Sequence, residues 1–351
     1  MIKEIKPTRN KEYSGHEKVF YFGNKKTKLK GYVAWHNTVN GPATGGTRLY
    51  GYKSDNEALG DVLRLSKAMT YKCAIAGVSF GGGKAVIMGT PEKKSKEFLK
   101  SYAKIIDSFN GKFTTGTDVG ISDADTKYMS KVTPFILKGT GGRTTTSLMA
   151  ARGVYEGIIS AFRTILPNKK IEDMTITVKG TGKIGAELVH LLYRHNVKII
   201  AGDKNSQSIT KIKKIFPKIK IADYKTIHKI KADIYAPCAM GGEFTPKTIK
   251  ELNCRIVAGG ANNQFVDERD AEKLSKRGIW YIPDYVINAG GLIQIVDELG
   301  KEGYNTKRVR NSIKKIGVTV AHLINESKKT GISTLEIAKK IAHEKILKAK
   351  K

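Results

Sequence analysis

Residues 174–203 read MTITVKGTGKIGAELVHLLYRHNVKIIAGD, and this stretch decides the fold of the second half of the chain. An apolar run rich in β-branched residues ends at Gly180, a helical pattern extends from Ile184 to Leu192, and a second apolar run ends at Asp203. Strand, turn, helix and strand in this order predict a βαβ unit with parallel strands. The arrangement is typical of a Rossmann domain that binds a dinucleotide.

The turn of this unit carries the glycine pattern G-T-G-K-I-G. In such a turn the first glycine permits the tight bend, the second lets a pyrophosphate approach the backbone, and the third lets helix and strand pack closely. The N-terminus of the following helix supplies free N–H groups to the phosphates. The alternative is an ordinary glycine-rich turn that binds no ligand. The residues that we expect to contact the dinucleotide here are Gly180, Thr181, Gly182, Lys183, Ile184 and Gly185.

Asp203 indicates which dinucleotide the sequence favours. It ends the second strand about 20 residues after the glycine turn, where an acidic side chain accepts hydrogen bonds from the ribose hydroxyls. A carboxylate at this point repels a 2′-phosphate, so we expect NAD rather than NADP as the cofactor. Lys204 follows directly and would weaken that repulsion.

The remaining patterns divide the chain into domains. Strand-like runs DIYAPC, RIVAGGANN and IWYIPDYVINAGG follow the βαβ unit and predict further parallel strands. Earlier runs, KLKGYVAWHNT, KAVIMG and FTTGTD, predict strands around a helix that opens with a capping box of Ser54 and Glu57. The helical face of that helix contains Ala58, Val62, Leu65 and Met69, and residues 81–83 are expected to form a glycine turn after it. Residues 139–146 are expected to be a hinge, so we assign domains to 1–142 and 143–317, with C-terminal helices 318–351 returning to the first domain.

Composition excludes several classes of protein. The chain has 351 residues, of which 40% are hydrophobic, so it holds enough apolar material for two domains. Its three cysteines form no CxxC pair and no Cys/His cluster, which argues against a disulfide framework and against a metal site. No apolar segment resembles a signal peptide or reaches membrane-spanning length. We therefore expect a cytoplasmic protein that does not contact a membrane.

The formal net charge of +31 admits two interpretations. Clustered lysines and arginines would favour a nucleic-acid-binding protein. The lysines are spread along the whole chain, however, and only the tail EKILKAKK forms a run. A solvated, lysine-rich surface that attracts anionic small molecules accounts for this distribution better, so nucleic acid is not an expected partner.

Lys72, Lys84 and Asp118 are candidates for acid–base chemistry. Lys84 follows three glycines and can lie deep in the fold, while Asp118 ends the predicted strand FTTGTD. By residue type alone, a lysine in so basic a chain is usually a surface residue, and an aspartate at a strand end is usually a cap. Spacing does not decide between these interpretations.

Six motifs favour a catalytic role for these residues, because together they resemble those of a known family. GPATGGTR, AMTYKCAIAGVSFGGGKAVI, TGTDVG, APCAMGG, VAGGANNQ and PDYVINAGG occur in this order between residues 31 and 299. Together they resemble the leucine/phenylalanine/valine/glutamate dehydrogenase superfamily, and most closely its leucine and phenylalanine branches. The resemblance implies an α/β fold in which an N-terminal mixed-sheet substrate domain precedes a C-terminal Rossmann NAD-binding domain, with a cleft between them.

The resemblance also implies a role for each matching residue. Lys72 would bind the substrate α-carboxylate, Lys84 would activate a water, and Asp118 would shuttle protons at the amino group. NAD would take a hydride from Cα, water would add to the resulting imino acid, and ammonia and a 2-oxo acid would leave. Gly45 and Gly46 would line the carboxylate site. Asn262 and Asn288 would lie near the nicotinamide and the substrate, and Cys238 and Ala239 near the cofactor ribose.

The same resemblance implies a hydrophobic substrate. Glutamate dehydrogenases carry a lysine where this chain has Thr44 and a serine where it has Ile295, so a glutamate side chain would be buried without a partner. The implied pocket, Thr44, Gly116, Leu292 and Ile295, suits leucine, valine or isoleucine, with phenylalanine as a further candidate. Such pockets distinguish one methylene by only ~1–3 kcal/mol, so the sequence does not choose among them.

Two alternatives and one departure accompany this prediction. A related enzyme could couple or transform a 2-oxo or amino acid without simple deamination, and a Rossmann frame could serve a nucleic-acid-binding protein. Ala150 stands where many relatives have a threonine that helps to hold nicotinamide. Like its relatives, the chain is expected to form a homo-oligomer.

Overall fold

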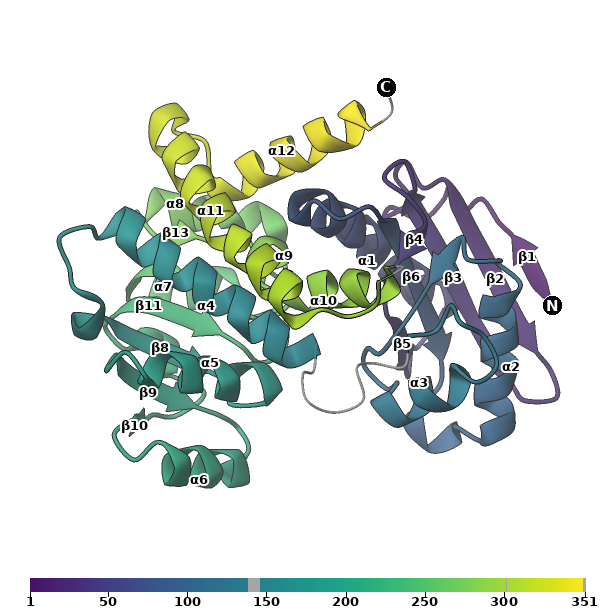
Figure 1. Ribbon diagram of the computed structural model, residues 1–351, viewed down its shortest axis with the longest axis horizontal. Coiled ribbons are helices and arrows are strands. Elements are labelled where there is room, and N and C mark those ends of the chain that lie inside the picture. Colours follow the sequence, from purple (N-terminus) through teal and green to yellow (C-terminus); the bar gives the residue numbers. More distant parts are fainter. Residues whose placement is uncertain (138–145, 301, 350–351) are drawn as a thin grey trace. The chain divides into compact units, whose positions relative to one another are not determined.

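The computed structural model describes residues 1–137, 146–300 and 302–349, and the chain divides into two compact units. Unit 1 contains Met1–Arg143 and Ala342–Lys351, and unit 2 contains Thr144–Ile341. The predicted hinge at 139–146 lies outside the described residues except for Thr146. The two sheets and their helices are drawn in Figure 1.

Unit 1 is built on a mixed sheet with the strand order β1-β2-β3-β6-β4-β7, and β5 also pairs with β6. The first four strands of this order pair antiparallel, whereas β4, β5 and β7 pair parallel. The predicted mixed sheet is therefore confirmed. Its strands are β1 (Ile2–Glu4), β2 (Lys18–Asn24), β3 (Leu29–Asn37), β4 (Ala43–Thr44), β5 (Thr47–Tyr50), β6 (Gly81–Met88) and β7 (Phe113–Thr114), and its helices are α1 (Asp55–Ala76), α2 (Lys96–Asp107) and α3 (Asp123–Met129).

The prediction of a glycine turn at residues 81–83 is wrong, because these glycines begin strand β6. An ideal Cβ at Gly82 would lie 2.1 Å from Thr70 Oγ1 on α1, and one at Gly83 would lie 2.8 Å from the Phe113 ring. The missing side chains let α1 and β7 approach the backbone of β6 closely. The glycines therefore serve packing, and they leave Lys84 in the middle of a buried strand.

The predicted capping box at the start of α1 forms only in part. The Ser54 side chain accepts a hydrogen bond from the Glu57 backbone, as predicted. The Glu57 carboxylate accepts instead from the backbone of Lys53, at 2.7 Å. The helix ends at Gly77 in the left-handed region, with φ +66°.

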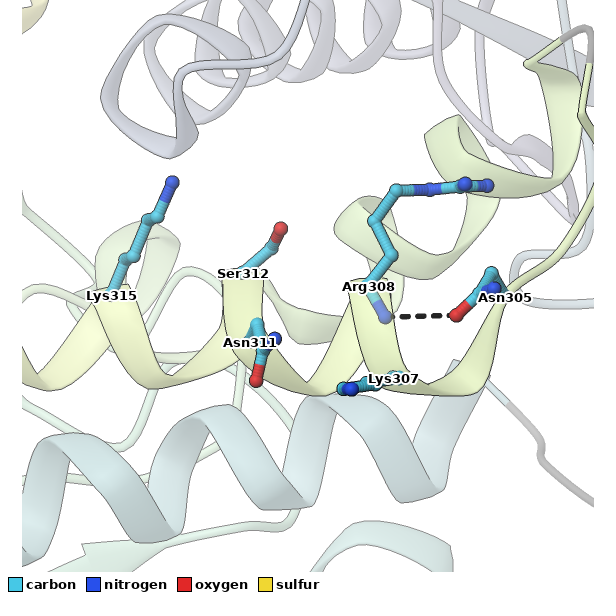
Figure 2. Close-up of a pocket in the computed structure, with 6 residues that line it drawn as sticks. All are labelled: Asn305, Lys307, Arg308, Asn311, Ser312 and Lys315. Carbon is cyan, nitrogen blue, oxygen red and sulfur yellow. Dashed lines mark hydrogen bonds between the residues drawn. The ribbon is translucent and has the colours of Figure 1, made fainter.

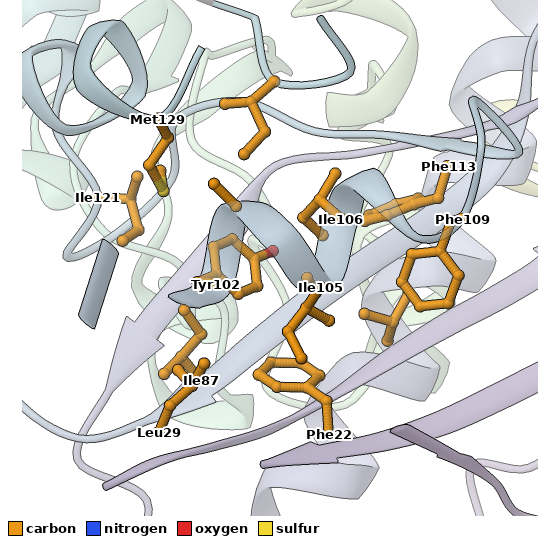
Figure 3. Close-up of a cluster of buried hydrophobic side chains, with 14 of the residues drawn as sticks. Phe22, Leu29, Ile87, Tyr102, Ile105, Ile106, Phe109, Phe113, Ile121 and Met129 are labelled. Carbon is orange, nitrogen blue, oxygen red and sulfur yellow. The ribbon is translucent and has the colours of Figure 1, made fainter. Parts of the chain in front are cut away.

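A hydrophobic core lies between α2 and the strands of unit 1. Apolar residues recur on α2 at helical spacing, and Figure 3 shows Tyr102, Ile105 and Ile106 packed beside Phe22 and Ile87. Tyr102 is fully buried, yet its hydroxyl is 2.6 Å from the hydroxyl of Thr47. The core thus contacts β5, one of the strands next to the candidate site. Its other labelled members in the figure are Leu29, Phe109, Phe113, Ile121 and Met129.

Unit 2 has a wholly parallel sheet with the order β10-β9-β8-β11-β12-β13. In chain order this is 3-2-1-4-5-6, the order of a Rossmann fold, so the predicted dinucleotide-binding fold is confirmed. The strands are β8 (Thr175–Lys179), β9 (Lys198–Gly202), β10 (Lys220–Ile221), β11 (Ala232–Pro237), β12 (Cys254–Val257) and β13 (Trp280–Tyr281). The helices are α4 (Thr146–Ile165), α5 (Lys183–Tyr193), α6 (Ser206–Ile215), α7 (Pro246–Glu251), α8 (Ala271–Lys276), α9 (Asp284–Ile287), α10 (Gly290–Leu299), α11 (Thr306–Thr330) and α12 (Thr334–Lys348).

The boundary between unit 2 and the C-terminal segment of unit 1 lies later in the chain than the sequence analysis placed it. Helix α11 packs along α4 within unit 2, where the Ser160 hydroxyl donates to the Gly317 carbonyl at 2.6 Å (Figure 1). Helix α12 has Leu335 in a core of unit 2, whereas Ala342 and Ile346 pack with Ala74 of α1 in unit 1. The segment grouped with unit 1 therefore begins at Ala342 rather than at residue 318, because the apolar face of α11 is buried against α4.

Candidate active site

A buried ion pair joins two of the predicted catalytic residues. Lys84 on β6 is 6% exposed, and its Nζ donates a hydrogen bond to Oδ2 of Asp118, which follows β7. Burial raises the pKa of Asp118, but the charges of Lys84 and Arg48 outweigh it and hold that pKa well below its usual range. A buried amine and a carboxylate in direct contact can exchange a proton.

The other oxygen of this carboxylate has two further contacts. Oδ1 of Asp118 accepts from the Val119 backbone at 2.6 Å and from Nε of Arg48 at 3.3 Å. Arg48 lies on β5 and the sequence analysis did not single it out. It ends the motif GPATGGTR, but its partner Asp118 is 70 residues away along the chain, so the motif alone does not show this contact.

The glycine pair Gly45–Gly46 lies beside Asp118. An ideal Cβ at Gly46 would lie 3.1 Å from Asp118 Cβ and 2.5 Å from the Thr117 carbonyl, so no larger residue fits. The Gly45 carbonyl accepts a hydrogen bond from the Thr115 hydroxyl at 2.8 Å. Because the peptide is planar and trans, the N–H of Gly46 points away from that carbonyl. This N–H is thereby fixed in direction and can serve a carboxylate.

A chain of buried hydroxyl groups leads from the glycine pair into the interior of unit 1. The Thr115 hydroxyl is 2.7 Å from the Thr47 hydroxyl, which is 2.6 Å from that of Tyr102. All three residues are buried in the interior of unit 1. The chain connects the hydrophobic core to the Gly45 carbonyl, and sequence spacing gives no sign of it.

Lys72 lies half-buried on α1, one helical turn after Met69. Met69 Cγ lies 3.4 Å from an ideal Cβ at Gly45, so this face of α1 packs against the glycine pair. Residues three apart on a helix share a face. The fold therefore brings Lys72 to the side of α1 that faces Gly45.

Two predicted pocket residues also lie in unit 1. Thr44 on β4 is buried, and its hydroxyl accepts a hydrogen bond from that of Thr114 at 2.9 Å. Gly116 is buried as well, and an ideal Cβ there would lie 3.7 Å from the Leu137 side chain, an ordinary contact distance. The position thus accepts a methyl group without strain.

In unit 2 the predicted cofactor turn has the geometry that a diphosphate needs. Gly180 has φ +95° and an ideal Cβ there would lie 2.8 Å from Ala239, while one at Gly185 would lie 1.9 Å from the Gly180 carbonyl. At Gly182, the N-cap of α5, no atom lies within 4 Å of an ideal Cβ, and no side chain caps the helix. The N-terminus of α5 is therefore open to an anion. An ideal Cβ at Gly185 would also lie 3.2 Å from Cβ of Cys238, which precedes Ala239, so this predicted cofactor pair lies at the turn.

The Asp203 carboxylate braces the same turn. Its Oδ2 accepts from the Thr181 backbone at 2.6 Å and its Oδ1 from the Asn205 backbone at 2.8 Å. Oδ2 also accepts from the Thr181 hydroxyl at 3.2 Å. A carboxylate oxygen can accept two hydrogen bonds, so Oδ1 has capacity for a ribose hydroxyl. Lys183 at the start of α5 is exposed and Ile184 is half-buried.

The remaining predicted residues of unit 2 fall into two groups. The side-chain amide of Asn288 donates to Oδ1 of Asn262 at 2.7 Å, and an ideal Cβ at Gly260 would lie 2.6 Å from Ile184. The Asn288 amide also donates to the Gly260 carbonyl. The hydrogen-bonded asparagines therefore lie near Ile184, at the start of α5. Leu292 and Ile295 lie one turn apart on α10, the first buried and the second half-buried.

A second buried ion pair, absent from the sequence analysis, lies directly before the glycine turn. Lys179 Nζ at the end of β8 is 2.8 Å from the Glu243 carboxylate and 4.6 Å from the centre of the Tyr224 ring. The Tyr235 hydroxyl donates to the same carboxylate at 2.5 Å. Both charged side chains are about one-tenth exposed, so the pair is a fixed part of the strand ends that surround the turn.

A hollow of about 410 Å³ lies elsewhere, on the surface of α11. Figure 2 shows that its lining side chains project from one end of that helix, where the Asn305 side chain caps the Arg308 backbone at 3.0 Å. It contains none of the predicted site residues. Its other lining residues are Lys307, Asn311, Ser312 and Lys315.

Within residues 1–137, 146–300 and 302–349, no three His, Cys, Asp or Glu side chains are grouped so that they could hold a metal ion. No helix in that part of the chain is long and apolar enough to span a bilayer.

Comparison with known proteins agrees with the two units. Residues 19–134 match the family model described as Glu/Leu/Phe/Val dehydrogenase, dimerisation domain, and residues 201–351 match Glutamate/Leucine/Phenylalanine/Valine dehydrogenase. Phenylalanine dehydrogenase of Thermoactinomyces intermedius is 40% identical over 95% of this chain and 92% of its own length. Leucine dehydrogenase of Bacillus cereus is 36% identical over the same shares of the two chains.

A solved structure extends this likeness to three dimensions. The crystal structure of L-tryptophan dehydrogenase from Nostoc punctiforme aligns with a TM-score of 0.83 and 35% identity. The alignment covers 96% of this chain and 97% of that one. The resemblance stated from six motifs is thus confirmed over nearly the whole chain. This protein belongs to the glutamate/leucine/phenylalanine/valine dehydrogenase family and is an amino-acid dehydrogenase.

Proposed function

We propose that this chain catalyses the reversible, NAD-dependent oxidative deamination of a hydrophobic L-amino acid to a 2-oxo acid and ammonia. The observation that carries the proposal is the buried Lys84–Asp118 pair beside the glycine pair Gly45–Gly46. In a member of this family, that arrangement puts an acid–base pair next to donors for a carboxylate.

The substrate carboxylate would bind to the Lys72 ammonium and to the N–H of Gly46. The Thr115 hydroxyl supports this site, because it fixes the orientation of the Gly45–Gly46 peptide. An ammonium and an oriented N–H together give charge-assisted hydrogen bonds, which are stronger than neutral ones. They would hold the amino acid by the group that all amino acids share.

Lys84 and Asp118 would carry the protons. Asp118 would accept a proton from the substrate ammonium at Oδ2, and NAD+, when bound, would accept the hydride from Cα. Lys84, after it has lost its own proton to solvent, would take a proton from the water that adds to the imino carbon. Asp118 would then protonate the amino group, take up the proton of the new hydroxyl as the carbonyl forms, and pass that proton to the departing ammonia, which leaves as ammonium. Each general acid or base typically contributes about 100- to 10,000-fold in rate.

NAD fits the residues of unit 2. The N-terminus of α5 is open and can accept a diphosphate. Gly180 and Gly185 are too crowded to carry any side chain. Thr181, Lys183 and Ile184 complete the turn that would hold the diphosphate. Asp203 would accept the ribose hydroxyls, which favours NAD over NADP.

The contacts near the reactive end of the cofactor are proposed on the same basis. Cys238 and Ala239 would contact the nicotinamide ribose, because they lie against the glycine turn. Asn262 and Asn288, which hydrogen-bond to each other, would orient the nicotinamide and the substrate.

Within unit 1 the substrate side chain would contact Thr44 and Gly116. The resemblance adds Leu292 and Ile295 as proposed substrate contacts. These residues supply no charge for the side-chain carboxylate of glutamate, and an unpaired buried charge is costly. Leucine, valine, isoleucine and phenylalanine are the candidates from the sequence. The names of the relatives add tryptophan, since one of them is an L-tryptophan dehydrogenase.

We propose further that the protein is a homo-oligomer in the cytoplasm. The family description of residues 19–134 as a dimerisation domain supports self-association. Light scattering on the purified protein tests it: a mass that is a multiple of 38.6 kDa is expected.

The activity is tested by adding hydrophobic amino acids and NAD+ and following NADH absorbance. Lys84→Ala should lower kcat by at least about 100-fold while the circular dichroism spectrum stays that of the wild type. Lys30→Ala is the matched control, because Lys30 on β3 of the same sheet forms a solvent-exposed ion pair with Asp55 of α1. Equal turnover in the Lys84→Ala variant and the wild type would remove Lys84 from the mechanism.

A further inference from the structure

We propose that Arg48 is a positioning residue, which clamps the Asp118 carboxylate against Lys84 through a set of ion pairs anchored on α1. The inference rests on the proposed dehydrogenase reaction, because it assigns a role to a neighbour of its proton-transfer pair. It concerns residues of unit 1 alone.

The guanidinium of Arg48 bridges two carboxylates. Its Nε lies 3.3 Å from Oδ1 of Asp118, and its Nη1 lies 2.9 Å from Oδ2 of Asp61 on α1. The three side chains are 13–21% exposed, so solvent screens these contacts only in part. Arg48 therefore connects the helix to the loop that carries the catalytic acid.

Asp61 is itself held in place, which makes it an anchor. Its Oδ2 accepts from the Tyr52 hydroxyl at 2.7 Å, and its Oδ1 from Nη2 of Arg64 at 2.5 Å. Burial and the Asp61 carboxylate raise the pKa of Tyr52 far above its usual range, so the hydroxyl stays a donor. Arg48 is thus fixed at one end by a carboxylate that has three partners.

The clamp decides which oxygen of Asp118 serves the reaction. Oδ1 is taken by Arg48 and by the Val119 backbone, whereas Oδ2 contacts Lys84. A carboxylate held on one oxygen by two donors cannot rotate about its terminal bond without losing both. Oδ2 is then kept in the position where it exchanges a proton with Lys84.

Most of the charges around Asp118 also favour its ionised form. Lys84 on β6 and Arg48 on β5 favour its ionised form, and Asp61 on the far side of Arg48 opposes it. Nearby, Lys94 bonds the Gly120 carbonyl and pairs with Asp125. Removing Arg48 would therefore leave two carboxylates with less positive charge between them.

An arginine is needed because the two carboxylates lie in different directions. The guanidinium has donors on separate nitrogens in a rigid plane, and a lysine has one point charge. Arg48→Lys should restore part of the charge effect but not the geometry, whereas Arg48→Gln should lose both.

The test compares Arg48→Gln, Arg48→Lys and Arg64→Gln. Arg64 contacts the same Asp61, whereas the ion pairs of Asp118 within the described residues are with Lys84 and Arg48. The loss of Arg64 therefore controls for net charge and for weakening of Asp61. We expect Arg48→Gln to lower kcat by about 10- to 100-fold with KM for the amino acid within about threefold, since Arg48 orients a catalytic group. The loss should grow as the pH falls, and Arg48→Lys should recover part of it.

Carbon-13 NMR of the labelled aspartate carboxyls gives a readout without turnover. The Asp118 signal should titrate at a higher pH in Arg48→Gln than in the wild type or in Arg64→Gln. An Arg48→Gln variant that matches Arg64→Gln in kcat, pH dependence and carboxyl titration would overturn the inference. A wild-type protein that makes no NADH from any amino acid would instead refute the proposed function, while the titration would still report on Arg48.

Discussion

Thr115→Val probes how unit 1 orients the proposed carboxylate site. The hydroxyl of Thr115 donates to the Gly45 carbonyl at 2.8 Å and lies 2.7 Å from the Thr47 hydroxyl. Valine has nearly the same shape, so the change removes both hydrogen bonds and leaves buried polar groups with fewer partners. Each such group costs about 1–3 kcal/mol, so the free energy of unfolding should fall by about 2–4 kcal/mol.

The same substitution should weaken binding of the amino acid. If the freed peptide no longer aims the Gly46 N–H, one charge-assisted hydrogen bond to the carboxylate is lost, which is about 1.5 kcal/mol or roughly tenfold in KM. We expect kcat to change by no more than about threefold, because Lys84 and Asp118 remain in contact. Initial rates with a series of amino-acid concentrations give both constants, and urea unfolding gives the stability.

Thr126→Val is the matched control for this experiment. Thr126 is 1% exposed and donates to the Asp123 carbonyl at 3.1 Å, but it lies on α3, in no contact with the glycine pair. It should lose stability and keep the wild-type KM. A Thr115→Val enzyme with a wild-type KM would refute the claim that the hydroxyl chain orients the Gly46 N–H.

Three further predictions concern pocket size, buried charge and pH. Gly116→Ala adds a methyl that fits at 3.7 Å from Leu137, so it should fold normally and lower kcat/KM for phenylalanine relative to leucine by about tenfold, as measured with competing substrates. Glu243→Gln leaves the buried Lys179 ammonium without its counter-charge and should lower the free energy of unfolding by about 3–5 kcal/mol in urea titrations. Burial, His16 and Lys67 lower the pKa of His36 from 6.5 to about 4, so the protein should lose stability as the pH falls from 6.5 towards 4, where the unfolded chain binds a proton that the folded chain does not. His36→Gln should flatten that dependence of the melting temperature on pH.

Local patterns predicted the fold of unit 2 because its signals lie close together in the sequence. The strand, the glycine turn, the helix and Asp203 fall within 30 residues, and each has a stereochemical reason for its position. The mixed sheet of unit 1 came from resemblance instead. Its strands pair across long stretches of chain, and alternating hydrophobicity does not say which strands are neighbours.

The errors of sequence analysis have physical causes. Gly81–Gly83 suggested a turn because glycine favours turns, but here the absence of side chains lets α1 and β7 pack against β6. Glu57 has the spacing of a capping box, yet the Lys53 backbone competes for its carboxylate. The part of helix α11 from residue 318 onward was expected with the first domain, but the apolar face of the helix packs against α4.

The sequence predicted those residues of the candidate site that lie in family motifs and have a known role there. Lys84 and Asp118 were identified by resemblance, and the fold brings them into contact. Arg48 was not singled out although it ends the motif GPATGGTR, because its partner Asp118 is distant in sequence. The pair of Lys179 with Glu243 was not identified for the same reason. Contacts of this kind follow only from the packing of strands and helices.

The proposed reaction requires that the Lys84–Asp118 pair releases ammonia as the amino acid is oxidised. The most direct test measures ammonia and NADH together, from one hydrophobic amino acid, with the wild type and with Asp118→Asn. We predict one ammonia for each NADH in the wild type and a loss of both products, by at least about 100-fold, in the variant. NADH without ammonia, or undiminished formation of both by Asp118→Asn, would contradict the account.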